Sequence, residues 1–480
     1  MSISSTETNN NKSVVMMHDK LSEDWEAIDQ LLAQTLDEAS LLLKSLDKRP
    51  VGVSEKTHPI LSLPNVGTGA SSMLGELMER YADGFSASAG PRYWAFVTGG
   101  STPAALMGDW IASTVDQNAA DPNSSATHIE LEALAMLRQL FGLSEDRHEG
   151  SFVTGATMSN FVGLACGRQW VGHQHNVDIA QEGLVSVPPI KVLSALPHSS
   201  IYKALSMLGL GRNAVQKIQT LPDRESIDLV ALEEVLVEIG QPCIVCANAG
   251  TVNSVDFDDI RGIVELRDKY PFWLHVDGAF GGFAACSPAH SHLLDGWDDA
   301  DSICIDAHKW LNVPYDSAIQ LTRHPDLQVE TFCNAAAPYL AGGNSAAAGF
   351  IHRTPENSRR FRALPAWCTL MAYGRDGYRN IVERNCYVAQ QLGDWLDRQE
   401  EFDLLSPVRL NGVVFTLRGR SGMDAVRAYL DRLRDGGQLY LTPTIHLDVA
   451  AMRISVVNWR SDVADIAVAQ QALRDALIDE

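Results

Sequence analysis

Short apolar runs alternate with stretches of helical periodicity through the middle of the chain. Between residues 151 and 323 the runs are four to eight residues long, and helical stretches near residues 229–239 and 258–270 separate some of them. Strands that are apolar throughout are buried on both faces, so this pattern predicts an α/β fold in which a mainly parallel sheet has helices on both sides. The runs are SFVTG, KVLSALPH, CIVCANAG, FWLHVDGA, SICIDAH and AIQLTR.

The N-terminal region carries a different pattern. From Leu21 onward, apolar side chains recur at three- and four-residue steps, which predicts a helix with one apolar stripe. The stripe either packs on the helix's own domain or, because so long a stripe needs a large partner surface, packs across a dimer interface. Residues 50–75 are rich in Pro, Gly and Ser and predict a linker or extended segment. The stripe consists of Trp25, Ile28, Leu32, Leu36, Ala39, Leu43 and Leu46.

The C-terminal region predicts a smaller α+β domain. The strand-like runs VVFTLR and AMRISVVNW are flanked by helical patterns at residues 377–399 and 462–478. We therefore expect three parts: an N-terminal helical and extended segment (1–100), a large domain (101–372) and a small C-terminal domain (373–480).

Composition and charge exclude several classes of protein. The chain has 480 residues, of which 45% are hydrophobic and 20% charged, as in an ordinary folded globular protein. Its formal net charge of −22 argues against nucleic acid or an anionic membrane as a partner, since both favour basic surfaces. No apolar run reaches the ~18 residues of a membrane-spanning helix. The first twelve residues lack the basic and apolar regions of a signal peptide, so we expect a cytoplasmic protein.

The cysteines indicate core packing and no metal site. Most of the eight lie in apolar segments, where a thiol behaves as a small hydrophobe. Cys243 and Cys246 form a CxxC motif, but neither a second CxxC nor a histidine pair completes a site. Alternation along a strand would point the two thiols to opposite faces, so we predict that both pack in the core.

Polar residues follow several of the predicted strands, at the edge where parallel sheets bind ligands. Asp277 closes one apolar run, and Lys309 closes the next, 32 positions later. A carboxylate and an amine at two fixed points suit a cationic pyridine ring. They predict an enzyme that uses pyridoxal 5'-phosphate (PLP), with Lys309 as the Schiff-base lysine and Asp277 paired with the ring nitrogen. The alternatives are an exposed loop acid and a lysine whose amine reaches solvent.

Two further turns fall at strand ends. Residues 154–157, Thr-Gly-Ala-Thr, join a strand to a helix, where small and hydroxyl residues let backbone N–H groups approach a phosphate, although many such turns share this composition. His198 precedes a serine pair at the start of another helix, a position typical of a capping or solvent-facing residue.

Five segments together resemble a known family. TGATMSN, PHSS, ANAGTVN, HVDGAFGG and DAHKWLNVPYD occur in the order found in the group II PLP-dependent amino acid decarboxylases, which are fold-type I enzymes and include the aromatic-L-amino-acid and glutamate decarboxylases. The resemblance covers the chain from about Gly90 to its C-terminus. It implies decarboxylation of an L-amino acid to an amine and CO2, and a homodimer with its active sites at the subunit interface.

The resemblance also implies roles for single residues. Lys309 and Asp277 match the Schiff-base lysine and the partner of the ring nitrogen. Other positions match residues that surround the cofactor: Ala156 and Thr157 the phosphate-binding turn, His198 the histidine stacked on the ring, Ala279 the small residue under the ring, His308 the neighbour of the lysine, and Asn248 a position near a polar neighbour of the cofactor.

The sequence departs from the family in two places. The tyrosine that is thought to return a proton to Cα falls at or near Phe350, so we expect Tyr339 or His352 to be the donor. Without a donor, reaction with oxygen would give an aldehyde. Asp306 stands where an asparagine is usual, and an anion near the phosphate is unfavourable unless it is protonated or turned away. Residues 335–350, rich in Gly and Ala, suit a mobile lid or a plain surface linker.

Several alternatives stay open at this point. Transamination, lyase chemistry and oxidative decarboxylation use the same scaffold, and a non-catalytic protein with this fold is the remaining class. Arg453 either holds a substrate carboxylate or forms a structural ion pair. Tyr93, Trp94 and Phe96 either indicate a substrate with an apolar or aromatic side chain or belong to the core.

Overall fold

The computed structural model describes residues 17–54, 56–120, 124–334, 349–420 and 422–478. By its internal contacts the chain forms two units. One comprises residues 1–49 and 53–87, and the other comprises residues 50–52 and 88–480. Each is described by itself.

The N-terminal unit consists of helices with exposed apolar side chains. The single helix predicted from Leu21 is two helices, α1 (Asp19–Glu26) and α2 (Ile28–Ser45), because Ala27 leaves the helical conformation. A third helix, α3 (Ala70–Tyr81), starts where the Asp24 carboxylate accepts a hydrogen bond from the Ala70 N–H at 3.1 Å. No residue of the three helices is buried. Trp25 of the stripe is 72% exposed and Leu32 is 58% exposed, so within the described residues of this unit the stripe is left uncovered at these positions.

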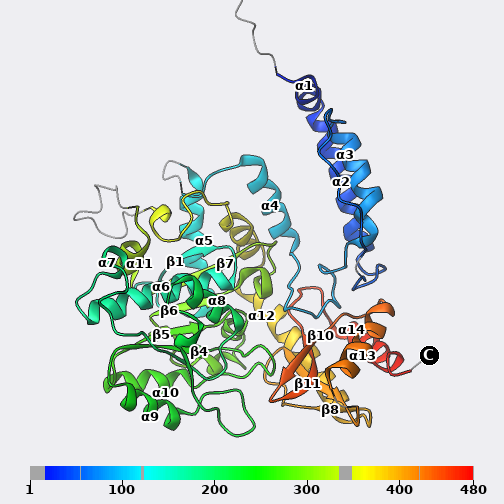
Figure 1. The fold of residues 1–480 in the computed structure, drawn as a ribbon. Helices are drawn as coiled ribbons and strands as arrows, with labels where there is room; N and C mark the ends of the chain where they lie inside the picture. The colour runs from blue at the N-terminus through cyan, green and yellow to red at the C-terminus, as the bar shows by residue number, and fades with distance from the viewer. Residues whose placement is uncertain (1–16, 55, 121–123, 335–348, 421, 479–480) are drawn as a thin grey trace, which may run out of the picture. The chain divides into compact units, whose positions relative to one another are not determined.

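The second unit is built on a seven-stranded sheet of order β1-β7-β6-β5-β4-β2-β3 (Figure 1). Strands β2 to β6 run parallel, and only β7 is antiparallel to its neighbours β1 and β6. The predicted mainly parallel α/β fold is confirmed. The strands are β1 (Glu149–Val153), β2 (Val192–Ser194), β3 (Val215–Lys217), β4 (Cys243–Asn248), β5 (Phe272–Asp277), β6 (Ser302–Ile305) and β7 (Ala318–Thr322).

Helices cover both faces of this sheet (Figure 1). On β4, Ile244 and Cys246 pack with α6 and α8, whereas Cys243 and Val245 pack with helices that include α5, α9, α10 and α12. The two thiols of the CxxC motif therefore lie in cores on opposite faces, as predicted. The helices are α4 (Pro103–Val115), α5 (Ser125–Phe141), α6 (Ala156–Gln174), α7 (Ile179–Glu182), α8 (Ser199–Met207), α9 (Leu229–Ile239), α10 (Ile260–Glu265), α11 (Pro325–Phe332) and α12 (Ala363–Asp397).

The C-terminal part of this unit has its own antiparallel sheet of order β10-β11-β9-β8. Trp94, 0% exposed, belongs to the core of this sheet, and Tyr93 stacks on Tyr440 with ring centroids 5.0 Å apart. Trp94 therefore belongs to the core, one of the two interpretations left open by the sequence, and Tyr93 is partly buried against Tyr440. The elements are β8 (Phe402–Leu404), β9 (Gly412–Leu417), α13 (Met423–Asp435), β10 (Thr442–His446), β11 (Val449–Ser455) and α14 (Val463–Asp475).

Helix α12 bends at Gly374, whose φ of 54° is unfavourable for residues with a side chain. The expected boundary between the large and small domains lies beside this glycine and stays a prediction. Among the described residues no helix is long and apolar enough to cross a membrane.

A buried ion pair ties the edge of the large sheet to the segment before α12. Arg359 and Glu130, each 1% exposed at the side chain, approach to 2.7 Å. Glu130 also accepts a hydrogen bond from the Phe152 N–H, and Arg359 donates to the Phe152 carbonyl oxygen. Strand β1, helix α5 and the segment at Arg359 are thereby held at one point.

We expect Glu130→Gln to lower the free energy of unfolding by about 3–5 kcal/mol, because it leaves the Arg359 charge buried without its partner. Urea unfolding measures the loss. The matched control is Glu233→Gln, which removes an exposed partner of Lys269 and should change the unfolding curve little. Equal curves for the two variants would contradict the prediction.

Candidate active site

A cavity of about 500 Å³ opens at the carboxyl ends of the parallel strands. Five residues predicted from the sequence line it: His198, Asn248, Asp277, Ala279 and Lys309. The remaining lining consists of Phe96, Val97, Leu196, Pro197, Ser199, Glu225, Gly250, Thr251, Val252, Asn253, Phe280, Thr444 and Arg453.

The strand register brings the central residues together. Asn248 pairs with Asp277 across β4 and β5, and Asp277 pairs with Cys304 across β5 and β6. Lys309 lies in the π-helical turn Ala307–Leu311, which follows β6. Asn312 ends this turn, where its side-chain amide donates to the Trp310 and Val457 carbonyl oxygens. The acid and the amine therefore come from neighbouring strands, as their positions in the sequence predicted.

Asp277 is oriented by neutral donors. One oxygen accepts from the Asn160 amide at 3.0 Å, and the other accepts from the Ala279 N–H at 3.2 Å. Asp277 forms no ion pair with any residue that the structure describes, so its charge is available to a cationic ligand.

His198 and Asn248 are also fixed by hydrogen bonds. His198 is the N-cap of α8, and its Nδ1 accepts from the Ser200 N–H at 3.3 Å. Burial lowers the pKa of His198 below its usual value, which favours the neutral imidazole. The backbone N–H and side-chain amide of Asn248 donate to Asp258, a carboxyl group whose pKa burial raises to about 6.

Lys309 has a carboxylate partner, Asp306, which was considered from the sequence only in relation to the phosphate. Its Nζ lies 3.3 Å from Asp306 Oδ2, and His308 Nε2 lies 3.1 Å from Asp306 Oδ1. Burial alone would raise the pKa of Asp306, but Lys309 and His308 outweigh burial and hold that pKa below its usual value. The Asp306 carboxylate thus faces Lys309 and His308, and these contacts favour its ionised form.

The expected phosphate turn begins α6. Ala156 and Thr157 are its first residues, and a Cβ atom at Gly155 would lie 3.4 Å from the His308 ring. Ala156, Thr157 and His308 do not belong to the cavity lining. They form a neighbouring cluster in which the N-terminus of a 19-residue helix offers N–H groups to an anion.

Glu225 was not identified from the sequence, and the role of Arg453 was left undecided between binding a substrate carboxylate and forming a structural ion pair. Glu225, 2% exposed, accepts hydrogen bonds from Thr251, Ser254 and His446. It lies in the connection before α9, where no local pattern marks it. Arg453 is 8% exposed and donates to the Val252 carbonyl oxygen at 2.6 Å, but it forms no ion pair with a carboxylate that the structure describes. The expected structural ion pair is therefore absent from the described part of the chain.

Of the two expected proton donors, His352 is within the described part of the chain and does not line the cavity. Tyr339 lies outside the described residues. Phe350 is 3% exposed, and its ring packs against the guanidinium groups of Arg353 and Arg359, at 5.3 and 5.0 Å. His352 is 1% exposed, and its Nδ1 accepts from the Asn334 N–H.

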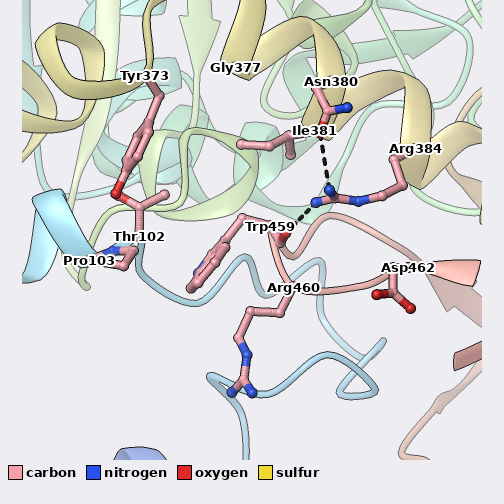
Figure 2. Close-up of a pocket in the computed structure, with 10 residues that line it drawn as sticks. All are labelled: Thr102, Pro103, Tyr373, Gly377, Asn380, Ile381, Arg384, Trp459, Arg460 and Asp462. Carbon is pink, nitrogen blue, oxygen red and sulfur yellow. Dashed lines mark hydrogen bonds between the residues drawn. The ribbon is translucent and has the colours of Figure 1, made fainter. Parts of the chain in front are cut away.

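A second cavity of about 470 Å³ lies between α12 and residues 459–462 (Figure 2). Figure 2 shows Arg384 at its wall, bonded to Asn380 and to the Trp459 carbonyl oxygen. The Arg384 Nε donates to the Ser461 carbonyl oxygen, so the guanidinium group is occupied by protein oxygens. None of the residues predicted for catalysis lines this cavity.

The fold and the first cavity define a PLP-dependent enzyme. An amine, an unpaired carboxylate, the small Ala279 and a helix N-terminus at one sheet edge fit the aldehyde, pyridine ring and phosphate of PLP. Residues 61–418 match the pyridoxal-dependent decarboxylase conserved domain, and the chain belongs to this family of PLP-dependent carboxy-lyases.

Individual proteins are similar to this chain. It is 29% identical to an aromatic-L-amino-acid decarboxylase of Bacillus atrophaeus, over 74% of this chain and 73% of that protein. It is 28% identical to a histidine decarboxylase of Drosophila melanogaster, over 78% of this chain and 46% of that protein. The structure of TDC from Oryza sativa with PLP and tryptamine has a TM-score of 0.85 at 22% identity, covering 94% of this chain and 97% of that chain. At 22% identity, this structural similarity shows a shared fold and no more.

The Glu225 carboxylate predicts a pH-dependent stability. Burial opposes its ionisation, but hydrogen bonds from His446, Thr251 and Ser254 lower its pKa to about 2, from 4.5. A lowered carboxyl pKa stabilises the folded state fully above pH 4.5, and this contribution is lost as the pH falls towards about 2. We expect Glu225→Gln to lower the thermal unfolding midpoint at neutral pH and to differ less from the wild type as the pH falls through 4.5.

Thermal unfolding across this pH range measures the effect. Glu238→Gln, on the exposed face of α9, is the control and should follow the wild type at each pH. A difference between Glu225→Gln and the wild type that does not change with pH would contradict the assignment.

Proposed function

We propose that the protein removes the α-carboxyl group of an L-amino acid as CO2 and releases the corresponding amine. The observation that carries this proposal is the placement of the Lys309 amine and the Asp277 carboxylate in one cavity at the ends of neighbouring strands. Membership of the decarboxylase family supports the reaction class.

PLP, when bound, withdraws electrons from Cα of the amino acid. Lys309 is proposed to hold its aldehyde carbon, and Asp277 to keep the pyridine nitrogen protonated, since a nearby carboxylate raises the pKa of that nitrogen. His198 is proposed to lie against the ring and to offer its Nε2–H to the substrate. Ala156 and Thr157 are proposed to receive the phosphate at the start of α6.

The remaining walls suit the loss of a carboxylate. Val97, Leu196, Pro197 and Phe280 form an apolar part of the cavity, and a carboxylate in such surroundings is favoured to lose its charge as CO2. Arg453 also lines the cavity, and its Nε is buried with no hydrogen-bond partner among the described residues. A carboxylate of the substrate would satisfy that group, so Arg453 is proposed to orient the substrate.

The second candidate is an oxidative reaction that gives an aldehyde. It is favoured by the absence of a tyrosine from the described lining of the cavity, because a carbanion that is not protonated promptly is open to oxygen. A 3,4-dihydroxyphenylacetaldehyde synthase of Drosophila melanogaster is 28% identical, over 64% of this chain and 56% of that protein. Transamination and lyase chemistry have no comparable observation in their favour.

We expect the purified protein with PLP to release CO2 from at least one member of a panel of aromatic, imidazole and acidic L-amino acids. Amine as the co-product supports the first candidate, and aldehyde with peroxide supports the second. Lys309→Ala should lose both CO2 release and the yellow absorbance of lysine-bound cofactor, whereas Lys269→Ala, at an exposed lysine, should keep both. Release of no CO2 from any substrate by the wild type would refute the proposal.

We further propose that the protein is a homodimer, as the family resemblance implies. Helix α4 exposes Met107, Trp110, Ile111 and Val115, with exposed fractions of 70%, 40%, 54% and 43%. These positions share one face of the helix, and an apolar face of this kind suits a second copy of the chain. The exposed stripe of α1 and α2 supports the same partner.

Light scattering during size-exclusion chromatography tests the dimer. We expect a mass of two chains for the wild type and of one chain for Ile111→Arg, because a buried unpaired charge disfavours association. Val237→Arg replaces an exposed valine of α9, 61% exposed, and should remain dimeric. A single-chain mass for the wild type would contradict the proposal.

A cytoplasmic location also stays a proposal. It is supported by the eight cysteines, all of which are free thiols, a state that persists in reducing compartments.

A further inference from the structure

A continuous chain of hydrogen bonds lies beneath the cavity and joins two of its proposed functional residues. Asn160, on α6, is at its centre. The Asn160 Nδ2 lies 3.0 Å from Asp277 Oδ2 and also 3.0 Å from Ser200 Oγ, which in turn lies 2.8 Å from His198 Nδ1. One amide group therefore connects the proposed partner of the ring nitrogen with the histidine at the start of α8.

The chain of hydrogen bonds continues on the other side of Asn160 into the sheet. Asn160 Oδ1 lies 2.9 Å from His275 Nε2, and His275 Nδ1 lies 2.8 Å from Ser302 Oγ. Ser302 Oγ accepts from the indole N–H of Trp273 at 3.0 Å. Asn160, His275, Ser302 and Trp273 are each 0% exposed, so no water competes for these groups.

The direction of each of these hydrogen bonds follows from the two end groups, the Trp273 indole and the Asp277 carboxylate. The Trp273 indole can only donate, so the Ser302 hydroxyl accepts from it. The Asp277 carboxylate can only accept, so Asn160 turns its NH2 group towards Asp277 and its Oδ1 towards His275 Nε2. Burial lowers the pKa of His275 to about 4, so its ring is neutral and its single proton is on Nε2, facing Asn160 Oδ1. His275 Nδ1 is therefore an acceptor, and the Ser302 hydroxyl donates to it.

The same logic fixes the state of His198. The Asn160 NH2 group donates to Ser200 Oγ, so the Ser200 hydroxyl donates onward to His198 Nδ1. The Ser200 N–H donates to the same nitrogen. Because Nδ1 accepts, the proton of neutral His198 is on Nε2.

The packing of α6 against β5 keeps this arrangement in place. A Cβ atom at Gly163 would lie 2.7 Å from His275 Nδ1 and 3.0 Å from Ser302 Oγ, so only glycine leaves room for the imidazole at this position. The chain of hydrogen bonds thus occupies a space with no room for an alternative position of the His275 ring.

We propose that Asn160 is a positioning residue for two side chains of the cofactor site. It orients Asp277 without neutralising its charge and, through Ser200, holds His198 with its proton on Nε2. An arginine or lysine at position 160 would orient the carboxylate equally well but would cancel the charge that the pyridinium needs. A neutral amide avoids this conflict. This inference rests on the proposed function for the roles of Asp277 and His198.

Binding of PLP to the apoprotein, measured by absorbance titration without substrate, tests the first part. We expect Asn160→Leu, which keeps the branched shape of the side chain but removes the donors, to weaken PLP binding about tenfold or more, since hydrogen bonds to charged groups are the stronger ones. It should also shift the pH dependence of the bound cofactor's absorbance. Asn411→Leu replaces another fully buried asparagine, whose amide donates to the Val456 carbonyl oxygen, and should leave PLP affinity unchanged.

Asn160→Asp separates positioning from packing. An ionised aspartate would repel Asp277, whereas a protonated one can donate a hydrogen bond to it, as the amide does. We expect PLP binding by this variant to be weak at alkaline pH and to strengthen as the pH falls, which loss of packing alone would not produce.

Ser200→Ala tests the second part. It removes the hydroxyl donor to His198 and keeps the Asn160–Asp277 bond, so we expect PLP affinity within about threefold of the wild type and a shifted pH dependence of the bound cofactor's absorbance. Ser206→Ala, at an exposed serine of α8, should change neither.

Wild-type affinity and absorbance in Asn160→Leu, or an equal loss in Asn411→Leu, would overturn the proposal. An unchanged absorbance profile in Ser200→Ala would overturn the part that concerns His198. None of these measurements needs turnover, so absence of CO2 release by the wild type would refute the proposed function without deciding this inference.

Discussion

The parallel pairing of β4, β5 and β6 is the constraint on which the active site depends. Because the three strands end at one edge, Asn248, Asp277 and the turn that carries Lys309 meet there without any long loop. Both faces of these strands are buried, so a one-residue slip in register would turn every side chain to the opposite core. The same packing that stabilises the sheet therefore sets the positions of the acid and the amine.

Much of this could be predicted from the sequence because burial leaves a local signal. Apolar runs such as that before Asp277 identify buried strands, and the residue that ends such a run lies at the ligand-binding edge. The CxxC thiols were assigned correctly for the same reason, since alternation along a strand is a local property. The acid and the amine at two such ends indicated the cofactor, and the family motifs then assigned roles to the residues around it.

The residues that sequence reasoning missed depend on contacts between distant segments. Asn160 reaches Asp277 across 117 positions, and Glu225 meets His446 across 221. Asn160 ends the motif TGATMSN, but the motif gives no role for its side chain, and nothing near Glu225 in the sequence indicates a role. The break at Ala27 was missed, and the burial of Trp94 was left as one of two alternatives, because neighbouring structure, rather than periodicity, decides them. The contacts of Asp306 with Lys309 and His308 were not predicted, because its charge was weighed, from the sequence, only against a phosphate.

The antiparallel strand β7 has a consequence for the order in which the chain can fold during synthesis. Strand β1 lies at the edge of the sheet, and β7 is its only neighbour, with Glu149 opposite Thr322. Until the ribosome has released β7, β1 has no strand to pair with. The turn at Ala156, which follows β1, is then not held in place by the sheet. Strands β2 to β6 can assemble earlier, since each pairs within the preceding segment. The nascent chain therefore builds the part of the site around Asp277 before it can complete the part around Ala156 and Thr157, and the edge of β6 stays open to wrong partners in the interval.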